Sequence, residues 1–279
     1  MSKIILITGS TDGIGKQTAL ELAERNNQII IHGRDEKKCI STLNEIKSKT
    51  GNQKIDYVVA DFSTIKSIEQ MANTISSKYS HLDVLLNNAG VYLRERKTND
   101  RGIELTFMIN HLAHFYLTFL LFDLIKESDD GRIINVSSIA HESADFNDDD
   151  FMLGKKYSGY TAYANSKLFN LLFTYALHRR LKNSNVKVYA LHPGVISTKL
   201  LYEGFRITGS PLNIGAETPV YLSTSENVKN QSGNYFIKKK PVKSSRVSYD
   251  EGLQEKLWNY SLELLGLNKE EVDQKFRFN

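Results

Sequence analysis

Residues 4–15 read Ile4-Ile5-Leu6-Ile7-Thr8-Gly9-Ser10-Thr11-Asp12-Gly13-Ile14-Gly15, an apolar run followed by a glycine-rich turn. A helical pattern begins at the end of this turn and continues to about Glu24. Glycines at a strand-to-helix junction let the backbone turn tightly and let a pyrophosphate approach the amide groups of the helix N-terminus. A glycine-rich turn alone is also ordinary loop chemistry. Its place between the first strand and the first helix favours a dinucleotide site, with the spacing G-x-x-x-G-x-G.

The rest of the chain continues this alternation of apolar runs and helical patterns. Strands that are apolar on both faces, separated by crossover helices, predict a parallel sheet covered on two sides. We therefore expect a single α/β domain over residues 1–279, a doubly wound, Rossmann-like sheet with helices on both faces. The expected strands are Ile4–Thr8, Gln28–His32, Ile55–Val59, Val84–Leu86, Arg132–Val136 and Lys187–Leu191. The expected helices cover residues 35–49, 65–78, 102–126, 160–181 and 251–265.

Composition and charge narrow the class of protein. The chain has 41% hydrophobic and 24% charged residues, which is ordinary for a soluble globular protein. Its net charge of +4 is weak evidence for a nucleic-acid or membrane partner, and we expect no nucleic-acid partner. Its one cysteine, Cys39, excludes an internal disulfide and favours a reducing, cytoplasmic location. The apolar segment Leu112–Ile125 is shorter than the roughly 20 residues that span a bilayer. We expect no transmembrane segment, with peripheral membrane association as the alternative.

The end of the second strand bears on cofactor choice. Dinucleotide folds that use NAD usually place an acid there to bind the ribose hydroxyls. Gly33 occupies that place here and Arg34 follows it. A guanidinium pairs well with a 2′-phosphate, so we expect NADP(H), with NAD(H) as the alternative. Asp12, whose charge would repel that phosphate, and Asp35, one position late for the ribose, are the observations against this expectation.

Tyr163 and Lys167 lie four residues apart, on one face of the helix expected over 160–181. Free tyrosine and lysine have pKa values of about 10 and 10.4, so neither is a good acid or base near neutrality. A fixed cation beside a phenol favours the phenolate, and we expect it to lower the pKa of Tyr163. The alternative is an amphipathic surface helix.

Three motifs together resemble the short-chain dehydrogenase/reductase family. They are the T-G-x-x-x-G-I-G start, Asn87-Asn88-Ala89-Gly90 after the fourth strand, and the Y-x-x-x-K pair. Residues 132–138, 192–195, 233–236 and 257–258 are similar to the retinol-dehydrogenase-like branch. That resemblance implies reduction or oxidation of a lipophilic carbonyl or alcohol, such as a retinoid or steroid, with NADP(H). The competing hypothesis is a non-catalytic dinucleotide-binding sensor or scaffold.

The resemblance also implies roles for four catalytic residues. Tyr163 would donate or accept the proton, and Lys167 would lower its pKa and hold the nicotinamide ribose. Ser138 would donate a hydrogen bond to the substrate oxygen. Asn110 would hold a water in the proton relay.

Further residues are expected around the cofactor by the same resemblance. Asn87 to Gly90 would shape the adenosine side, where the alternative is a strand-ending turn with side-chain hydrogen bonds. Asp61 would sit against the adenine, with Phe62 beside it. Pro193, Gly194, Val195 and Thr198 resemble the loop that holds the nicotinamide carboxamide, although a Pro-Gly pair is also ordinary turn chemistry.

The remaining features are not expected to take part in the chemistry directly. We expect no metal site, because the acidic run 148–150 reads as a solvated loop. His111, His114, His141 and His192 read as packing or loop residues, and the basic run 238–243 as a loop after the last strand. The polar run 142–159 and the segment 200–219 lie outside the alternation and are expected to line the substrate pocket. A homo-oligomer would form through the two long helices around 102–126 and 160–181.

Overall fold

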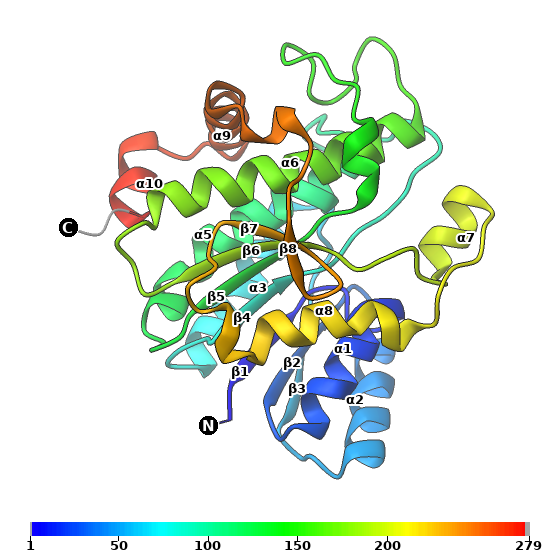
Figure 1. The fold of residues 1–279 in the computed structure, drawn as a ribbon, viewed down its shortest axis with the longest axis vertical. Helices are drawn as coiled ribbons and strands as arrows, with labels where there is room; N and C mark the ends of the chain where they lie inside the picture. Colours follow the sequence, from blue (N-terminus) through cyan, green and yellow to red (C-terminus); the bar gives the residue numbers. More distant parts are fainter. Residues whose placement is uncertain (1, 277–279) are drawn as a thin grey trace.

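The computed structural model describes residues 2–276, and its centre is one sheet of eight strands (Figure 1). The strand order is β3-β2-β1-β4-β5-β6-β7-β8; β1 to β7 run parallel and β8 runs antiparallel to β7. The strands are β1 (Ile4–Ile7), β2 (Gln28–Gly33), β3 (Ile55–Val59), β4 (Val84–Asn87), β5 (Arg132–Val136), β6 (Lys187–His192), β7 (Asn234–Ile237) and β8 (Lys240–Val242). The predicted doubly wound, Rossmann-like fold is confirmed.

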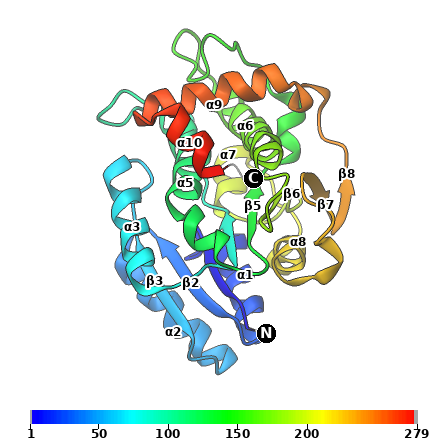
Figure 2. The same cartoon turned by 90° about the vertical axis from the view of Figure 1, so that its left-hand side faces the viewer.

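Helices cover both faces of the sheet. Ile5 and Ile7 of β1 pack toward α1, α2 and α8, whereas Leu6 packs toward α3, α5, α6, α9 and α10 (Figure 2). This alternation follows from the two-residue period of a strand. The helices are α1 (Gly13–Glu24), α2 (Glu36–Thr50), α3 (Ile65–Lys78), α4 (Leu105–Phe107), α5 (Ala113–Lys126), α6 (Gly159–Arg180), α7 (Lys199–Phe205), α8 (Leu212–Thr224), α9 (Glu251–Leu265) and α10 (Lys269–Phe276).

The basic run 238–243 is not the loop that we expected. Lys238 and Lys239 have φ of 49° and 63° and form a tight reversal, after which β8 pairs with β7. Two central residues with positive φ are the geometry of a two-residue hairpin, which glycine and asparagine usually supply. Two lysines give no such signal in the sequence. Pro241 in β8 lacks an N–H and so limits further pairing at this edge.

The segment 200–219 also differs from the expectation, because it holds α7 and the first part of α8. Pro219 lies inside α8, where proline usually breaks a helix, and this obscured the helical pattern. The polar run 142–159 is mostly irregular, as expected, apart from the end of a 3-10 turn at Ile139–Ser143.

The C-terminal helices cover the face of α5 and α6 that we expected to bind a second copy. Trp258 of α9 packs on Phe115, with ring centroids 4.8 Å apart, and Phe276 of α10 packs on Phe122 at 4.6 Å. The Arg180 guanidinium lies 3.8 Å from the centre of the Trp258 ring, a cation–π contact. The chain's own C-terminal helices therefore cover part of the surface of α5 and α6, and self-association through these helices stays a prediction.

One apolar stretch runs from residue 105 to residue 126 through α4, a π-helical turn and α5. By length and composition it is the one described helix that meets the requirement for crossing a membrane, but 78% of its apolar window is buried inside the fold. Its Phe115, Leu117 and Leu121 are 2% exposed or less. In this structure the stretch packs as a core helix.

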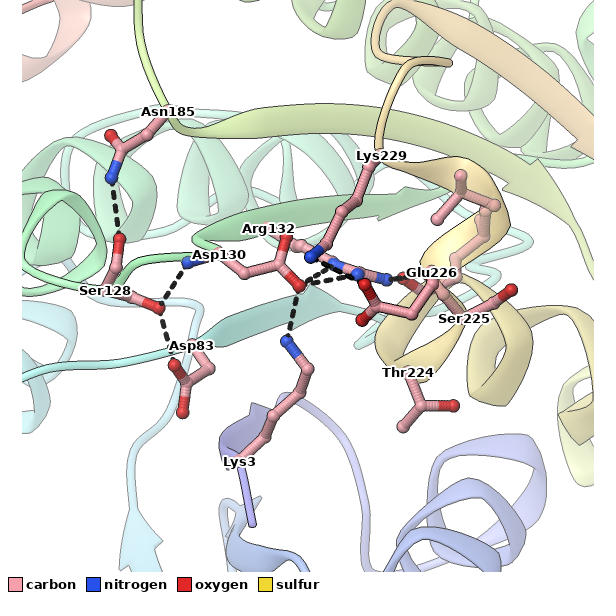
Figure 3. A network of polar contacts seen from close by, with 12 residues as sticks. Lys3, Asp83, Ser128, Asp130, Arg132, Asn185, Thr224, Ser225, Glu226 and Lys229 are labelled. Carbon is pink, nitrogen blue, oxygen red and sulfur yellow. Dashed lines mark hydrogen bonds and ion pairs between the residues drawn. The ribbon is translucent and has the colours of Figure 1, made fainter. Parts of the chain in front are cut away.

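A buried arginine joins three elements at the N-terminal edge of the sheet (Figure 3). Arg132 is fully buried, and its guanidinium pairs with Asp130 at 2.6 Å. It also donates to the carbonyl oxygens of Leu222 and Ser225, at 2.7 and 2.9 Å, at the end of α8. Lys3, just before β1, pairs with the same Asp130 at 2.8 Å. A buried charge is tolerated when it is paired and hydrogen-bonded in this way.

Candidate active site

The predicted site residues follow strands that end at one edge of the sheet. The glycine-rich loop follows β1, the Asn-Asn-Ala-Gly turn follows β4, Ser138 follows β5 and Pro193 follows β6. The chain order reverses between β1 and β4, because β2 and β3 lie on one side of β1 and the later strands on the other. Ligands of doubly wound sheets bind outside the carboxyl ends of the strands at such a point.

The phosphate loop, residues 8–15, has glycines where a side chain would collide with backbone. A Cβ on Gly9, whose φ is +63°, would lie 2.8 Å from Ala89 Cα. A Cβ on Gly15 would lie 2.4 Å from the Gly9 carbonyl oxygen. Asp12 caps α1, its carboxylate accepting from the Gly13 N–H at 2.8 Å. The loop thus offers bare backbone at a helix N-terminus, a suitable cradle for phosphate.

An ion pair reduces the electrostatic repulsion between Asp12 and a bound phosphate. Lys199 at the start of α7 pairs with its carboxylate at 3.0 Å. Partial burial raises the pKa of Asp12, but hydrogen bonds with Lys199 and Gly13 outweigh this and hold the pKa below its ordinary value. The carboxylate is therefore ionised and neutralised by a neighbouring cation.

The Asn-Asn-Ala-Gly turn is bonded to the phosphate loop. The Thr8 hydroxyl accepts from the backbone N–H groups of Asn88 and Ala89, at 2.8 and 3.0 Å. The Asn88 amide donates to the carbonyls of Thr8 and Gly9. Asn87 is fully buried and donates to Asn135 at 2.9 Å. Both asparagine side chains thus hold the protein together, and the backbone of the turn is the part left for a ligand.

Gly33 stands where NAD-binding folds usually carry an acidic residue, and there is little room for a side chain at this position. A Cβ on Gly33 would lie 2.6 Å from the Thr11 methyl carbon. Asp35 is engaged elsewhere, because its carboxylate caps α2 by accepting from the Lys38 N–H at 3.1 Å. Arg34 is exposed and forms no ion pair within the described part of the chain. Of these residues, Arg34 is the one available to a ribose substituent.

The adenine-side residues differ in how accessible they are. Asp61 is exposed, and one of its carboxylate oxygens accepts from the Ser63 N–H at 2.9 Å. The Phe62 ring is 4% exposed and stacks on His32, with centroids 4.3 Å apart. The ring of Phe62 therefore faces into the protein, and only its backbone remains for a ligand.

Tyr163, Lys167 and Ser138 meet where α6 passes the end of β5. The Lys167 ammonium lies 5.5 Å from the centre of the Tyr163 ring and donates to the Val136 carbonyl at 3.1 Å. Ser138 lies close enough to the Tyr163 hydroxyl to oppose the rise in its pKa that burial causes. Tyr163 and Lys167 are 8% and 3% exposed. The structure thus brings together the phenol, cation and hydroxyl that the sequence predicted.

The predicted fall in the pKa of Tyr163 is wrong. Burial raises the pKa of Tyr163 to about 12, although Ser138 acts in the opposite direction. Burial also lowers the pKa of Lys167 to about 8. The spacing in the sequence indicated that a cation lies beside the phenol, but not that both groups are buried. Desolvation has the larger effect on the pKa of each group.

Asn110 lies in a π-helical turn, Met108–Leu112, within the long helix. Its amide accepts from the Val91 N–H at 2.8 Å and donates to the Val91 carbonyl and the Ser166 hydroxyl, both at 3.0 Å. A Cβ on Gly90 would lie 3.5 Å from Asn110 Oδ1 and 3.6 Å from Lys167 Nζ, so these three residues converge. Single π-helical turns occur frequently at functional sites.

The loop after β6 lies beside the phosphate loop. Thr198 caps α7 by accepting from the Leu201 N–H at 3.1 Å, and its methyl carbon would touch a Cβ on Gly13 at 3.4 Å. Gly194 has a φ of +102°, and Val195 is 45% exposed. Pro193 is half-buried between these groups and β6.

An aromatic cluster that the sequence did not reveal surrounds the Tyr163 ring. Phe205 of α7 packs on Tyr163 at 5.7 Å, on Tyr92 at 5.0 Å and on Tyr160 at 6.0 Å, measured between ring centroids. Tyr92 also packs on Tyr163 at 5.9 Å. Phe205 was expected as pocket lining. Tyr160 precedes Tyr163 by almost one helical turn, which was a usable signal, whereas Tyr92 gave none.

A model of the short chain dehydrogenase family matches residues 3–205. The chain belongs to this family. Curated relatives include human retinol dehydrogenase 13, 38% identical over 97% of this chain and 86% of its own length. Human polyprenol dehydrogenase is 36% identical over 95% of this chain and 86% of its own length. The resemblance to the retinol-dehydrogenase-like branch is thereby confirmed.

Solved structures share the fold of this short-chain dehydrogenase. A putative uncharacterized protein from Mycobacterium paratuberculosis aligns with a TM-score of 0.80 and 29% identity, covering 95% of this chain and 94% of that one. A short chain dehydrogenase from Shigella flexneri, complexed with NADP, aligns at 0.70 and 24% identity, covering 85% and 97%. As a member of its family, the chain is an oxidoreductase that acts on alcohol and carbonyl groups.

Two of the histidines weighed in the sequence, and the acidic run 148–150, have local hydrogen-bond or ion-pair partners. His141 Nδ1 donates to the Ser138 carbonyl at 2.6 Å, and its Nε2 accepts from the Ser245 N–H at 3.1 Å. His111 bonds with Ser261 at 3.2 Å. His114 and His192 are buried. In the acidic run, Asp148 and Asp149 pair with Lys256, and Asp150 accepts from the Gly154 and Lys155 N–H groups.

Proposed function

We propose that the protein is an NADP(H)-dependent oxidoreductase that transfers a hydride between nicotinamide and the carbonyl or alcohol carbon of a lipophilic substrate. We further propose that residues 1–279 form one dinucleotide-binding and catalytic domain, in a cytoplasmic protein. The observation that carries the proposal is the convergence of Ser138, Tyr163 and Lys167 beside the phosphate loop. A retinoid, a steroid and another aldehyde or ketone are the substrate candidates.

The catalytic residues have defined roles in this proposal. When bound, nicotinamide supplies or accepts the hydride at the substrate carbon. Tyr163 donates its hydroxyl proton to the carbonyl oxygen during reduction, while Ser138 donates a hydrogen bond to the same oxygen. The Lys167 charge stabilises the phenolate that this transfer leaves. Because the Asn110 amide is engaged with Val91 and Ser166, its backbone carbonyl is the group that we assign to a relay water.

The residues present suit a phosphorylated dinucleotide. Gly9 and Gly15 allow the close backbone packing of the phosphate loop at the N-terminus of α1. We assign the carboxamide of nicotinamide to Pro193, Gly194, Val195 and Thr198. Exposed Arg34, together with the Cβ exclusion at Gly33, supports NADP(H) over NAD(H). Asp61 and the backbone from Asn87 to Gly90 are proposed for the adenosine half.

Aromatic and aliphatic side chains support a lipophilic substrate. Tyr92, Tyr160 and Phe205 surround Tyr163, and Ile207 and Ile214 are 48% and 41% exposed on the neighbouring segment. Relatives named as retinol and polyprenol dehydrogenases make a retinoid and a long-chain prenol sensible test substrates.

A substrate panel tests the proposal. Purified protein is assayed by NADPH and NADH absorbance with retinal, ketosteroids, a polyprenal and simple aldehydes. We expect turnover of at least one lipophilic carbonyl, with a higher kcat/KM for NADPH than for NADH. Tight NADPH binding without turnover across the panel would instead support the non-catalytic sensor or scaffold.

A further inference from the structure

His32, at the end of β2, connects two turns that lie on the proposed cofactor side. Its side chain is buried, at 3% exposure. The Nδ1 atom accepts from the Gly9 N–H at 3.0 Å, and the Nε2 atom lies 3.1 Å from the Ala60 carbonyl oxygen. An amide N–H only donates and a carbonyl only accepts, so the ring carries its proton on Nε2. The imidazole thus bridges the phosphate loop and the segment after β3.

The surroundings of His32 hold it in this neutral form. Phe62 stacks on the ring at 4.3 Å with an interplanar angle of 20°, and the rings of Phe62 and His114 are nearly perpendicular, with centroids 6.3 Å apart. Burial lowers the pKa of His32 to about 4. At neutral pH the acceptor at Nδ1 is therefore always present for Gly9.

Backbone hydrogen bonds join the same segments. The Ser10 N–H donates to the His32 carbonyl at 2.9 Å, and the His32 N–H donates to the Ser10 hydroxyl at 3.0 Å. The Ala60 N–H donates to the Gly33 carbonyl at 3.1 Å. Hydrogen bonds thus connect the phosphate loop with the ends of β2 and β3. The His32 imidazole links the phosphate loop directly to the end of β3.

We infer that His32 is a positioning residue for the dinucleotide, which fixes Gly9 of the phosphate loop relative to the adenine-side residues 60–62. This inference rests on the proposed NADP(H) binding. Gly9 has a positive φ, and a Cβ there would collide with Ala89, so the loop approaches its neighbour closely. Without an acceptor, the partly buried Gly9 N–H loses its partner and the loop relaxes away from this geometry. His32 acts through Gly9, so its loss weakens cofactor binding and leaves the saturated enzyme's chemistry intact.

Two substitutions separate the two hydrogen bonds of the ring. Asparagine places its amide oxygen near the position of Nδ1 and keeps the acceptor for Gly9. Glutamine places its amide nitrogen near the position of Nε2 and keeps only the donor to Ala60. We expect His32→Asn to bind NADPH within about threefold of the wild type, and His32→Gln to bind it about tenfold more weakly, the usual effect of one lost hydrogen bond.

The readouts are the Kd for NADPH by fluorescence titration and the Kd for 2′,5′-ADP, which probes the adenosine half alone, by calorimetry. Both Kd values should rise together in His32→Gln, while kcat at saturating NADPH stays within about twofold of the wild type. His178→Gln is the control variant, because it changes a histidine whose side-chain hydrogen bond, to Ser232, involves none of the proposed cofactor residues. We expect no change in either Kd for this variant.

Thermal unfolding of each variant separates positioning from stability. Equal Kd values for the asparagine and glutamine variants would overturn the inference, as would a loss of stability in His32→Gln with unchanged affinity per folded molecule. If His32→Gln does not fold, His32→Asn still decides, because a tenfold loss of affinity there would refute the role of the Nδ1 acceptor. Absence of NADPH and 2′,5′-ADP binding to the wild type would refute the proposed function itself, and the inference with it.

Discussion

The burial of Lys167, a proposed catalytic residue, lowers the stability of the fold, and Lys167→Met should reveal that cost. Its ammonium is buried, and no carboxylate pairs with it within residues 2–276. Burial lowers its pKa from 10.5 to about 8, a difference of about 2.5. Since one unit of pKa corresponds to 1.36 kcal/mol, the buried charge destabilises the fold by about 3 kcal/mol at pH 7.

The sign of the effect follows from proton binding. Between pH 8 and 10.5 the unfolded chain binds more protons at this lysine than the folded protein, so stability rises with pH in that window. The cost is nearly complete at pH 7 and falls to about 1 kcal/mol at pH 10. Methionine matches the lysine stem and leaves the Val136 carbonyl with its second donor, Asn170, at 3.2 Å. Lys167→Met should therefore stabilise the fold at pH 7 and abolish turnover.

Urea unfolding of the cofactor-free protein, followed by the fluorescence of buried Trp258, measures the change at pH 7 and pH 10. Lys199→Met is the matched control, because the Lys199 side chain is 75% exposed and its loss should change stability by less than about 0.5 kcal/mol. We expect a gain of about 2–3 kcal/mol for Lys167→Met at pH 7 that shrinks at pH 10. A variant less stable than the wild type at pH 7, or a gain independent of pH, would refute the reasoning.

Three further substitutions test other parts of the structure. Arg34→Asp should move the kcat/KM preference toward NADH by at least about tenfold, since charged hydrogen bonds contribute about 1.5–3 kcal/mol; an unchanged ratio would show that Arg34 does not read the 2′-phosphate. Phe276→Ala should cost about 3–5 kcal/mol in urea unfolding, and a cost below about 1 kcal/mol would contradict the packing of the tail. Arg132→Met leaves Asp130 paired with Lys3 alone and leaves two carbonyl oxygens without this donor, so we expect the free energy of unfolding to fall by about 3–5 kcal/mol. An unchanged free energy of unfolding in the same assay would show that this network does not stabilise the fold.

The sequence predicted the elements whose signal is local. The strand Ile4–Ile7 is buried on both faces of the sheet, so it shows as a continuous apolar run. The hairpin to β8 was missed because Lys238 and Lys239 adopt positive φ angles, which lysine residues do not normally indicate. Pro219 likewise masked α8. These failures concern backbone conformations that tertiary contacts impose against local preference.

At the site, the sequence predicted which chemical groups meet but not their environment. Helical spacing placed Lys167 beside Tyr163, yet the pKa of each group depends on burial by segments far away in the chain. The contact of Phe205 with Tyr92 joins residues more than a hundred positions apart, and no spacing signals it. The two hydrogen bonds of His32 also depend on where three strands end, and this residue was not considered from the sequence.

Turnover and NADPH binding by Tyr163→Phe show whether the Tyr163 hydroxyl supplies the proton. The substitution removes the proposed proton donor and keeps the ring that packs on Tyr92 and Phe205. With a substrate from the panel, we expect kcat to fall at least about 100-fold, the lower range for general acid–base catalysis. The Kd for NADPH should stay within about threefold of the wild type. Near-normal turnover by this variant would contradict the assignment of Tyr163 as the proton donor and, with it, the proposed active site.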